Sequence, residues 1–182
     1  MTDDQRLPTE EWLLDAANFP GGHAATIVFP RTTADVVDVL TTSASVLPVG
    51  AQSSLTGGAT PAGDLVLSFA RMNRVLDIGP DRVRVEPGLT LASLQEALDS
   101  HGLYYPPVPT FTGASIGGAI ATNAAGAATF KYGSTRAWVE ARMTLPQMIG
   151  TLEKIQNQPP YLAVNSLTIS ADRALQSGKL DL

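Results

Sequence analysis

The chain has 182 residues, of which 44% are hydrophobic and 16% charged, a composition typical of a globular protein with its own core. Its formal net charge of −5 disfavours nucleic acid or an anionic membrane as the main partner, and the lack of cysteine excludes disulfides and thiolate chemistry. No apolar run approaches the roughly 18 residues of a membrane span, and the acidic N-terminus is unlike a signal peptide, so we expect a cytoplasmic protein.

The first third of the chain alternates predicted helices and strands. In order, they are a polar helix over 1–20, a strand over 25–30, a helix over 31–44, and strands over 45–50 and 64–69. Thr32 or Thr33 can cap the second helix, because a hydroxyl accepts a hydrogen bond from a free amide of the first turn. The buried side of this helix would consist of Val36, Val37, Val39 and Leu40.

The next third contains a predicted hairpin and a predicted amphipathic helix. Residues 74–88 alternate apolar and polar side chains on both sides of Gly79-Pro80-Asp81, which is typical of a hairpin. The helix over 89–102 has Thr90 as its expected N-cap and Gly102 as the residue after its C-terminus. Its apolar stripe consists of Leu91, Leu94 and Leu98.

The pattern changes near Arg142. "TLPQMIGTLEKIQNQ" predicts a helix with apolar residues on one side, and Pro159-Pro160 ends it. A strand is expected over 161–171, and "KLDL" begins another alternating pattern at 179–182. We therefore divide the chain into residues 1–141 and a short α/β segment over 142–182.

Two glycine-rich segments stand out, "PVGAQSSLTGG" (48–58) and "GASIGGAIATNAAG" (113–126). There is no Lys or Arg between Arg31 and Arg71, or between Arg84 and Lys131. An anion bound at either segment would therefore be held by neutral amides and hydroxyls, at a turn or at a helix N-terminus. Such donors suit the diphosphate of a cofactor. Alternatively, the glycines allow close packing and the alanines form a core helix, and spacing alone does not decide between the two.

Two common phosphate-binding motifs are excluded. A P-loop needs a lysine after its last glycine, and neither segment has one. Gly113, Gly117 and Gly118 do not follow the spacing of a nicotinamide-dinucleotide fingerprint, and no acidic residue follows at the required distance.

The chain resembles the FAD-binding domain of the FAD-linked oxidases, the PCMH or vanillyl-alcohol-oxidase type of flavoprotein, which includes glycolate oxidases and D-lactate dehydrogenases. The resemblance covers about residues 24–140. Its carriers, in order, are "IVFPRTTADVVDVL", "LPVGAQSSLTGGA", "LVLSFARMNRVLDI", "VRVEPGLTLASLQEALDSHGLYYPP", "TGASIGGAIATNAAG" and "KYGSTRAWV".

The resemblance implies an incomplete α+β fold in which FAD lies between two small α+β subdomains. The first glycine segment would be the diphosphate loop and the second would form the opposite wall of the site. The residues that would line the cofactor are Val49, Gly50, Ala51, Gln52, Ser53, Ser54, Gly57, Gly58, Pro107, Ser115, Gly117, Gly118, Thr122, Asn123, Gly126, Tyr132, Gly133 and Arg136.

Some relatives attach FAD covalently through a histidine in the first loop, and residues 48–58 contain no His or Cys, so non-covalent FAD is expected. The family's substrate and catalytic residues belong to parts that this sequence lacks. No catalytic residue and no metal site is therefore predicted. The expected function is a FAD-binding module of an oxidoreductase that acts on a 2-hydroxy acid or a related alcohol, and it would be inactive alone.

The tail allows a different hypothesis. Residues 145–174 and "GKLDL" faintly resemble the ferredoxin-like part of type II secretion protein M. In that case the chain would join two unrelated fragments. Its tail would mediate assembly with a secretion partner, and the chain would have no catalytic role.

Overall fold

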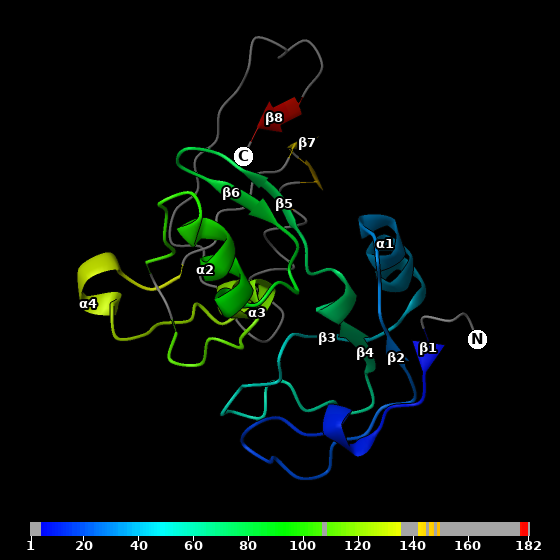
Figure 1. Cartoon of the computed structure of the whole chain (residues 1–182). Coiled ribbons are helices and arrows are strands. Elements are labelled where there is room, and N and C mark those ends of the chain that lie inside the picture. Colours follow the sequence, from blue (N-terminus) through cyan, green and yellow to red (C-terminus); the bar gives the residue numbers. More distant parts are fainter. Residues whose placement is uncertain are drawn as a thin grey trace. The chain divides into compact units, whose positions relative to one another are not determined.

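The structure, a computed structural model, describes residues 5–106, 109–135, 142–144, 146–147, 149 and 179–181. The chain divides into two compact units, Met1–Arg136 and Ala137–Leu182 (Figure 1). In the second unit, β7 (Arg142–Thr144) and β8 (Lys179–Asp181) form an antiparallel pair. The expected helix after residue 144 and the strand over 161–171 lie mostly outside the described residues. The domain boundary after residue 141 stays a prediction.

The first unit begins with a four-stranded sheet, here called the sheet lobe (residues 5–72). Its strands are β1 (Gln5–Arg6), β2 (Ile27–Val28), β3 (Val46–Val49) and β4 (Leu65–Ser68), in the order β1-β2-β4-β3. Strands β2, β4 and β3 are parallel, and β1 is antiparallel to β2. The core of this lobe consists of Ile27, Phe29, Val49 and Val66.

The predicted polar helix over residues 1–20 is wrong. The segment contains β1, the short 3₁₀ helix η1 (Glu10–Trp12) and irregular chain. Trp12 packs edge-on against Phe29, with ring centroids 5.4 Å apart. Trp12, Leu13 and Leu14, the apolar contacts expected for the helix, are consecutive and so do not share one helix face, and docking of Trp12 onto the sheet core stabilises the local conformation instead.

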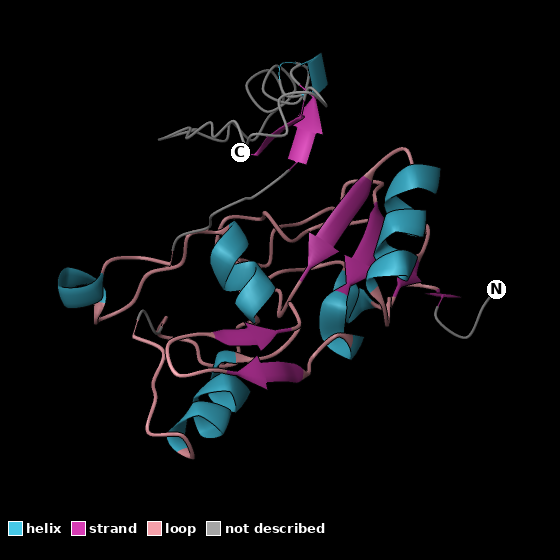
Figure 2. Ribbon diagram, turned by 90° about the horizontal axis from the view of Figure 1, so that it is seen from above, coloured by secondary structure: helices cyan, strands magenta, loops and turns pink. Residues whose placement is uncertain are grey.

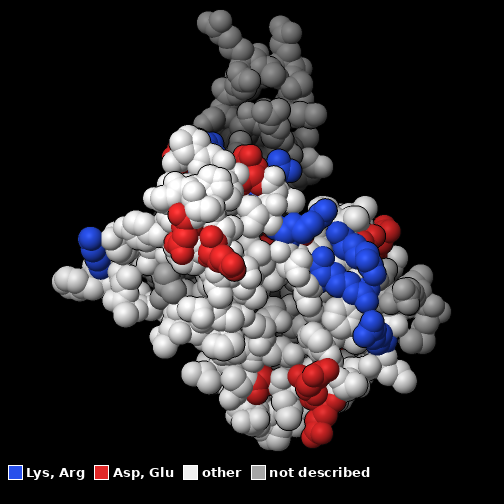
Figure 3. Space-filling model, viewed as in Figure 1, with Lys and Arg blue, Asp and Glu red and all other residues white. Residues whose placement is uncertain are grey.

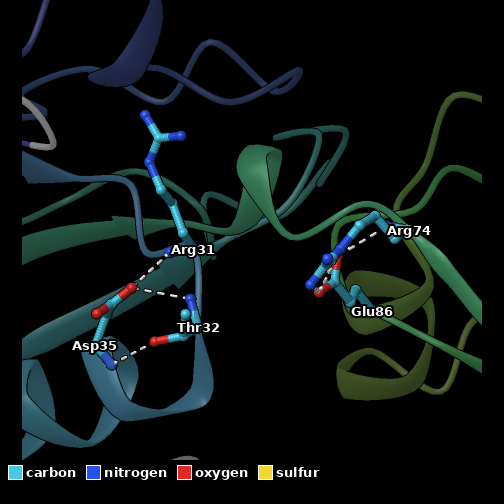
Figure 4. A network of polar contacts seen from close by, with 5 residues as sticks. All are labelled: Arg31, Thr32, Asp35, Arg74 and Glu86. Carbon is cyan, nitrogen blue, oxygen red and sulfur yellow. Dashed lines mark hydrogen bonds and ion pairs between the residues drawn. The ribbon is translucent and has the colours of Figure 1, made fainter.

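Helix α1 (Thr33–Thr42) forms where it was predicted, and Thr32 is its N-cap. The Thr32 hydroxyl accepts from the Asp35 amide, and the Asp35 carboxylate accepts from the amides of Arg31 and Thr32 (Figure 4). Hydrogen bonds from these amides lower the pKa of Asp35, and the one from the Arg31 amide has the largest effect. The expected buried side is wrong, however. No residue of α1 is buried, and Val37 and Leu40 are 51% and 55% exposed.

The second lobe, here called the hairpin lobe (residues 74–135), is built on β5 (Val75–Ile78) and β6 (Val83–Val85), which form the predicted hairpin. Helix α2 (Leu91–Asp99) lies against this hairpin (Figures 1 and 2). Thr90 caps α2, and Gly102 follows it with a φ of +67°. Leu91, Leu94 and Leu98 are all buried, as predicted, and form the lobe core with Leu89 and Ile116.

Two short helices complete the lobe. Helix α3 (Ile116–Ala121) lies within the second glycine segment, and α4 (Thr129–Tyr132) follows it. The first unit thus consists of two small α+β lobes with separate cores, which agrees with the mixed α+β class expected from the sequence. Within the described residues, every helix is too short or too polar to cross a membrane.

Candidate functional site

The first glycine segment forms the loop that leaves the sheet at the end of β3. Val49, the last residue of β3, is in register with Ser68, the last residue of the parallel strand β4. Loops at the carboxyl ends of parallel strands are the usual place for ligands in open α/β sheets. The position of residues 50–58 is therefore compatible with a binding loop.

Unpaired amides make this loop a candidate for binding an anion. In residues 5–106 and 109–135, no acceptor takes a hydrogen bond from the amides of Ala51, Ser53 or Ser54. The Ser54 hydroxyl lies 3.1 Å from that of Thr56 and also accepts from the Thr56 amide. Free amides and hydroxyls in one turn are neutral donors of the kind that hold a diphosphate.

Gln52 anchors the loop to the segment before β2. It has a left-handed φ of 48°, and its carbonyl accepts from the Ala16 amide at 2.9 Å. Its side-chain amide donates to the carbonyl of Leu14 at 2.9 Å. The Gln52 side chain is therefore occupied within the protein. The sequence pattern gave no indication that residues 14–16 support this loop.

The two glycine segments meet at Gly50. A Cβ added to Gly50 would overlap the Ser115 hydroxyl oxygen, and it would lie 3.8 Å from the Gly118 Cα. Ser115 is buried and is the N-cap of α3. The fold thus brings together two segments that are more than 60 positions apart in the sequence, and residue 50 must be glycine for them to meet this closely.

The start of α3 offers no free donors, contrary to the expectation that this helix N-terminus would bind an anion. The amides of Ile116 and Gly117 donate to the carbonyls of Leu89 and Pro87, both at 2.8 Å. The Gly118 amide donates to the Ser115 hydroxyl at 3.2 Å. The sequence analysis did not anticipate these internal acceptors. They satisfy the amides that a ligand would otherwise use.

Gly117 serves packing in this arrangement. A Cβ at this position would lie 2.9 Å from the Pro87 Cβ and 3.0 Å from the Pro87 carbonyl oxygen. Gly117 therefore fits the alternative, left open by the sequence, that the glycines allow close packing. Gly117 also lines an open groove of about 620 Å³ in the hairpin lobe, together with Val85, Ile116 and Ile120. No residue of loop 50–58 lines this groove.

The remaining predicted residues follow α3. Thr122 donates its hydroxyl to the Gly118 carbonyl, and Asn123 has a left-handed φ of 50°. The Gly126 amide donates to the Thr129 hydroxyl at 2.8 Å, and Gly133 ends α4 with a φ of +80°. Pro107 and Arg136 lie outside the described residues.

Tyr132 belongs to an exposed pair of phenols. Its hydroxyl lies 2.8 Å from that of Tyr104, and the Lys131 ammonium is 4.7 Å from the centre of the Tyr132 ring. The Lys131 side chain has the largest effect in lowering the pKa of Tyr132, and the Tyr104 hydroxyl lowers it further. The hydrogen bond between the two hydroxyls raises the pKa of Tyr104. Tyr132 is therefore the more acidic of the two phenols.

The loop leaves its backbone open at one glycine. At Gly58, an added Cβ would meet only the hydroxyls of Thr56 and Ser54, at 3.5 and 3.7 Å. The backbone at Gly58 is thus open on the side of these two hydroxyls, and a ligand could approach the chain closely there.

Comparison with known proteins identifies the family. Residues 24–148, well over half of the chain, match the sequence profile of the FAD binding domain. The chain therefore belongs to this family of FAD-binding domains, as the FAD-linked oxidase motifs predicted. Both glycine segments lie inside the matched range.

Two relatives are glycolate oxidase subunits. The chain is 36% identical over 121 residues to subunit GlcD of Bacillus subtilis, an alignment that covers 62% of this chain and 26% of the relative. It is 33% identical over 189 residues to subunit GlcD of Escherichia coli K12, which covers 100% of this chain and 34% of the relative. The chain spans about a quarter to a third of the length of these proteins.

The fold is also found among solved structures. Two structures of alkyldihydroxyacetonephosphate synthase match with TM-scores of 0.56 and 0.57, at 23% and 22% identity. Each match covers 64% of this chain and 24% of the synthase. The likeness confirms the fold.

The resemblance of the tail to type II secretion protein M is not supported. The alignment with the E. coli glycolate oxidase subunit extends over the whole chain and includes residues 142–182. Relatedness to a single protein over the full length argues against a junction of two unrelated fragments.

Proposed function

We propose that this chain binds FAD between its two glycine segments and serves as the flavin module of an oxidoreductase that acts on a 2-hydroxy acid or a related alcohol. The observation that carries the proposal is the contact between Gly50 and Ser115, which unites a donor-rich loop with the second glycine segment. Membership of the FAD-binding domain family supports the choice of cofactor.

Loop 50–58 would contribute most of the diphosphate contacts. The free amides of Ala51, Ser53 and Ser54 supply neutral donors, and Gly58 leaves the backbone accessible. Gly57 serves the turn instead, with a φ of +76° and the Phe19 ring packed against it. Residues of α3 would act differently, because their amides are already satisfied. They would form a narrow wall, with Ser115 holding the helix start in place.

The substrate class is inferred from relatives whose names include glycolate oxidase and D-2-hydroxyglutarate dehydrogenase. When bound, FAD supplies the acceptor for the two electrons of an alcohol oxidation. The residues in this chain position the cofactor and exclude water from it. We assign no catalytic residue here, and we expect the chain alone to be inactive.

The cofactor is expected to be bound non-covalently, since the first loop offers no His or Cys as an attachment point. Acid precipitation of the FAD-loaded protein should then leave the flavin in the supernatant. A cytoplasmic location, expected from the polar N-terminus and the lack of a long apolar run, belongs to the same proposal.

A glycine substitution in the loop tests the site. Gly58→Ala should weaken FAD binding roughly tenfold, because a methyl group beside the Ser54 and Thr56 hydroxyls keeps a ligand from the backbone. The apo-fold should tolerate this methyl group, whose contacts would be at ordinary distances of 3.5 and 3.7 Å. Affinity is measured by titrating FAD and following its fluorescence.

Gly79→Ala is the matched control. It makes the same chemical change in the hairpin turn, where the nearest atom would be the Arg82 Cγ at 3.4 Å. Equal FAD affinity of the Gly58→Ala and Gly79→Ala proteins would contradict the assignment of the loop. Absence of FAD binding by the unsubstituted chain would overturn the proposed function itself.

A further inference from the structure

Two buried side-chain oxygens of the sheet lobe, Oδ2 of Asp15 and Oγ1 of Thr60, have no hydrogen-bond partner in the described part of the chain. Asp15 is 4% exposed, and its other carboxylate oxygen accepts from the Ala17 amide at 3.0 Å. A buried carboxylate oxygen without a donor costs free energy, and such groups are few in native proteins. The Asp15 carboxylate therefore points to a group that the protein binds here.

The two oxygens belong to segments that lie side by side. The side-chain nitrogen of Gln52 lies 2.9 Å from the Leu14 carbonyl oxygen and 3.5 Å from the Ala59 carbonyl oxygen. Leu14 directly precedes Asp15, and Ala59 directly precedes Thr60. One amide group thus bridges the chain on the two sides of the candidate site.

The Leu13 carbonyl is a third oxygen at this place. A Cβ at Gly22 would overlap this carbonyl oxygen and would lie 2.9 Å from the Thr60 Cγ2, so both groups border the same glycine. In residues 5–106 and 109–135, no donor makes a hydrogen bond to the Leu13 carbonyl. A carboxylate, a hydroxyl and a main-chain carbonyl are all oxygen ligands of the kind that hard cations prefer.

The surroundings of Asp15 favour a positive charge. Residues 7–30 and 32–70, which contain both segments, have no Lys or Arg. On the face shown in Figure 3, basic side chains gather over β2 and the 3₁₀ helix η2 (Phe69–Arg71), and the end of the lobe around η1 carries acidic side chains. A buried charge is stabilised when it is paired or coordinates a cation. Asp15 supplies one negative charge, so one monovalent cation leaves the site neutral.

We propose that the Asp15 carboxylate, the Thr60 hydroxyl and the Leu13 carbonyl bind a monovalent alkali cation, Na⁺ or K⁺. The cation would join the segment before β2 to the end of the first glycine loop. It would also support the anchor of that loop, where the Ala16 amide donates to the Gln52 carbonyl at 2.9 Å. A bound cation offsets the repulsion between the buried carboxylate and a diphosphate on the loop. This last step, a dependence of FAD binding on the cation, rests on the proposed function.

Thermal unfolding of the full chain without FAD tests the cation site. The protein is melted in NaCl, KCl and tetramethylammonium chloride at one ionic strength of about 0.1 M, which keeps general screening equal. The methyl groups of tetramethylammonium keep its charge away from oxygen ligands. In the preferred alkali salt, the melting temperature should be about 3 °C or more above that in tetramethylammonium chloride. Equal melting temperatures in the three salts would overturn the proposal, because an ordered water would then suffice for these oxygens.

Charge-removing variants assign the effect to the site. Asp15→Asn keeps an oxygen for the Ala17 amide but loses the charge, so its melting temperature should be the same in the three salts. Asp38→Asn is the matched control, since it removes the same charge from an exposed position of α1 and should keep the full alkali effect. Equal loss of the effect in both variants would overturn the assignment.

A second variant covers the case in which Asp15→Asn does not fold. Thr60→Val replaces the hydroxyl by a methyl group of similar size and keeps the Cγ2 beside Gly22. It should lose at least half of the alkali effect, because one ligand is gone. An unchanged effect in the folded Thr60→Val protein would refute the site.

A titration with FAD separates this proposal from the proposed function. FAD should bind roughly threefold more tightly in the preferred alkali salt than in tetramethylammonium chloride, and Asp15→Asn should remove this difference. Melting that depends on the alkali ion, with no FAD binding in any salt, would refute the proposed function and leave the cation site in place. FAD binding with melting that is independent of the salt would refute the cation site alone.

Discussion

The contact between the two glycine segments predicts a specific coupling between residues 50 and 115. A Cβ at Gly50 would overlap the Ser115 Oγ, and its next contacts would be the Ser115 Cβ at 3.2 Å and the Gly118 Cα at 3.8 Å. Gly50→Ala forces a packed junction apart and should lower the free energy of unfolding by about 2 kcal/mol, in the range of overpacking substitutions. Ser115→Ala removes the cap of α3 and should cost about 1 kcal/mol.

The two substitutions should not be additive. Once Ser115 is alanine, the overlapping oxygen is gone and the closest remaining atom is at 3.2 Å, a tight contact that a small shift relieves. Gly50→Ala should then cost less than about 1 kcal/mol, which leaves a coupling of about 1–2 kcal/mol between the two sites. Urea unfolding of the four proteins, followed by circular dichroism, measures this double-mutant cycle.

Additive effects would refute the reasoning, because they would mean that the two segments do not touch. The FAD affinity of the same proteins gives an independent readout. If Ser115→Ala restores stability to the Gly50→Ala protein without restoring FAD binding, the methyl group occupies space that the cofactor needs.

Two other predictions concern the hairpin lobe. Leu94→Ala should lower the free energy of unfolding by about 2–5 kcal/mol, because Leu94 is 2% exposed in the lobe core; a cost below about 1 kcal/mol in urea unfolding would place this residue outside the core. Hydrogen bonds from the Arg74 side chain, and next from the Arg74 amide, lower the pKa of Glu86 below its ordinary value of 4.5. The ionised Glu86 should therefore stabilise the fold above about pH 4.5, and this contribution should be lost as the pH falls further. The difference in unfolding free energy between the wild type and Glu86→Gln should therefore be constant near neutral pH and shrink in acid, and a difference that persists unchanged to pH 3 would contradict the ion pair.

The elements with strong local signals were predictable from the sequence. Thr32 and Thr90 are caps followed by periodic apolar residues, and both helices begin directly after these residues. The prediction that the leucine stripe of α2 is buried was correct, because a small lobe offers a helix with one apolar face only one core to pack against. Alternation around Gly79-Pro80-Asp81 identified the hairpin, since turn chemistry and strand period agree there.

Other features depend on contacts that no local pattern contains. The apolar residues of α1 share one side of the helix, as those of α2 do, yet Val37 and Leu40 remain exposed. Periodicity states which residues share a face, and what covers that face depends on the rest of the fold. The helix predicted for residues 1–20 failed for a related reason, because Trp12 is held by Phe29, a residue in another part of the sequence.

The Arg74–Glu86 pair illustrates the same limit at the level of single groups (Figure 4). Glu86 is buried, and both of its oxygens accept hydrogen bonds from Arg74, including one from the backbone amide at 2.8 Å. The two residues are opposite each other across the base of the hairpin, 12 positions apart. The sequence predicted the hairpin but gave no reason to expect a carboxylate buried at its base.

Glycine content alone did not identify a cofactor site, because these glycines have different roles. Those at positions 88 and 117 let backbone pass close to other backbone: a Cβ at Gly88 would overlap the Phe69 carbonyl, and one at Gly117 would press on Pro87. Loss of FAD binding in a Gly117→Val protein would therefore report broken packing as readily as a blocked site. Gly58 differs, because its surroundings leave room and its loop carries unpaired amides. A binding glycine is thus distinguished by what its neighbours leave unsatisfied, and for this reason Gly58 is the position whose substitution separates cofactor binding from folding.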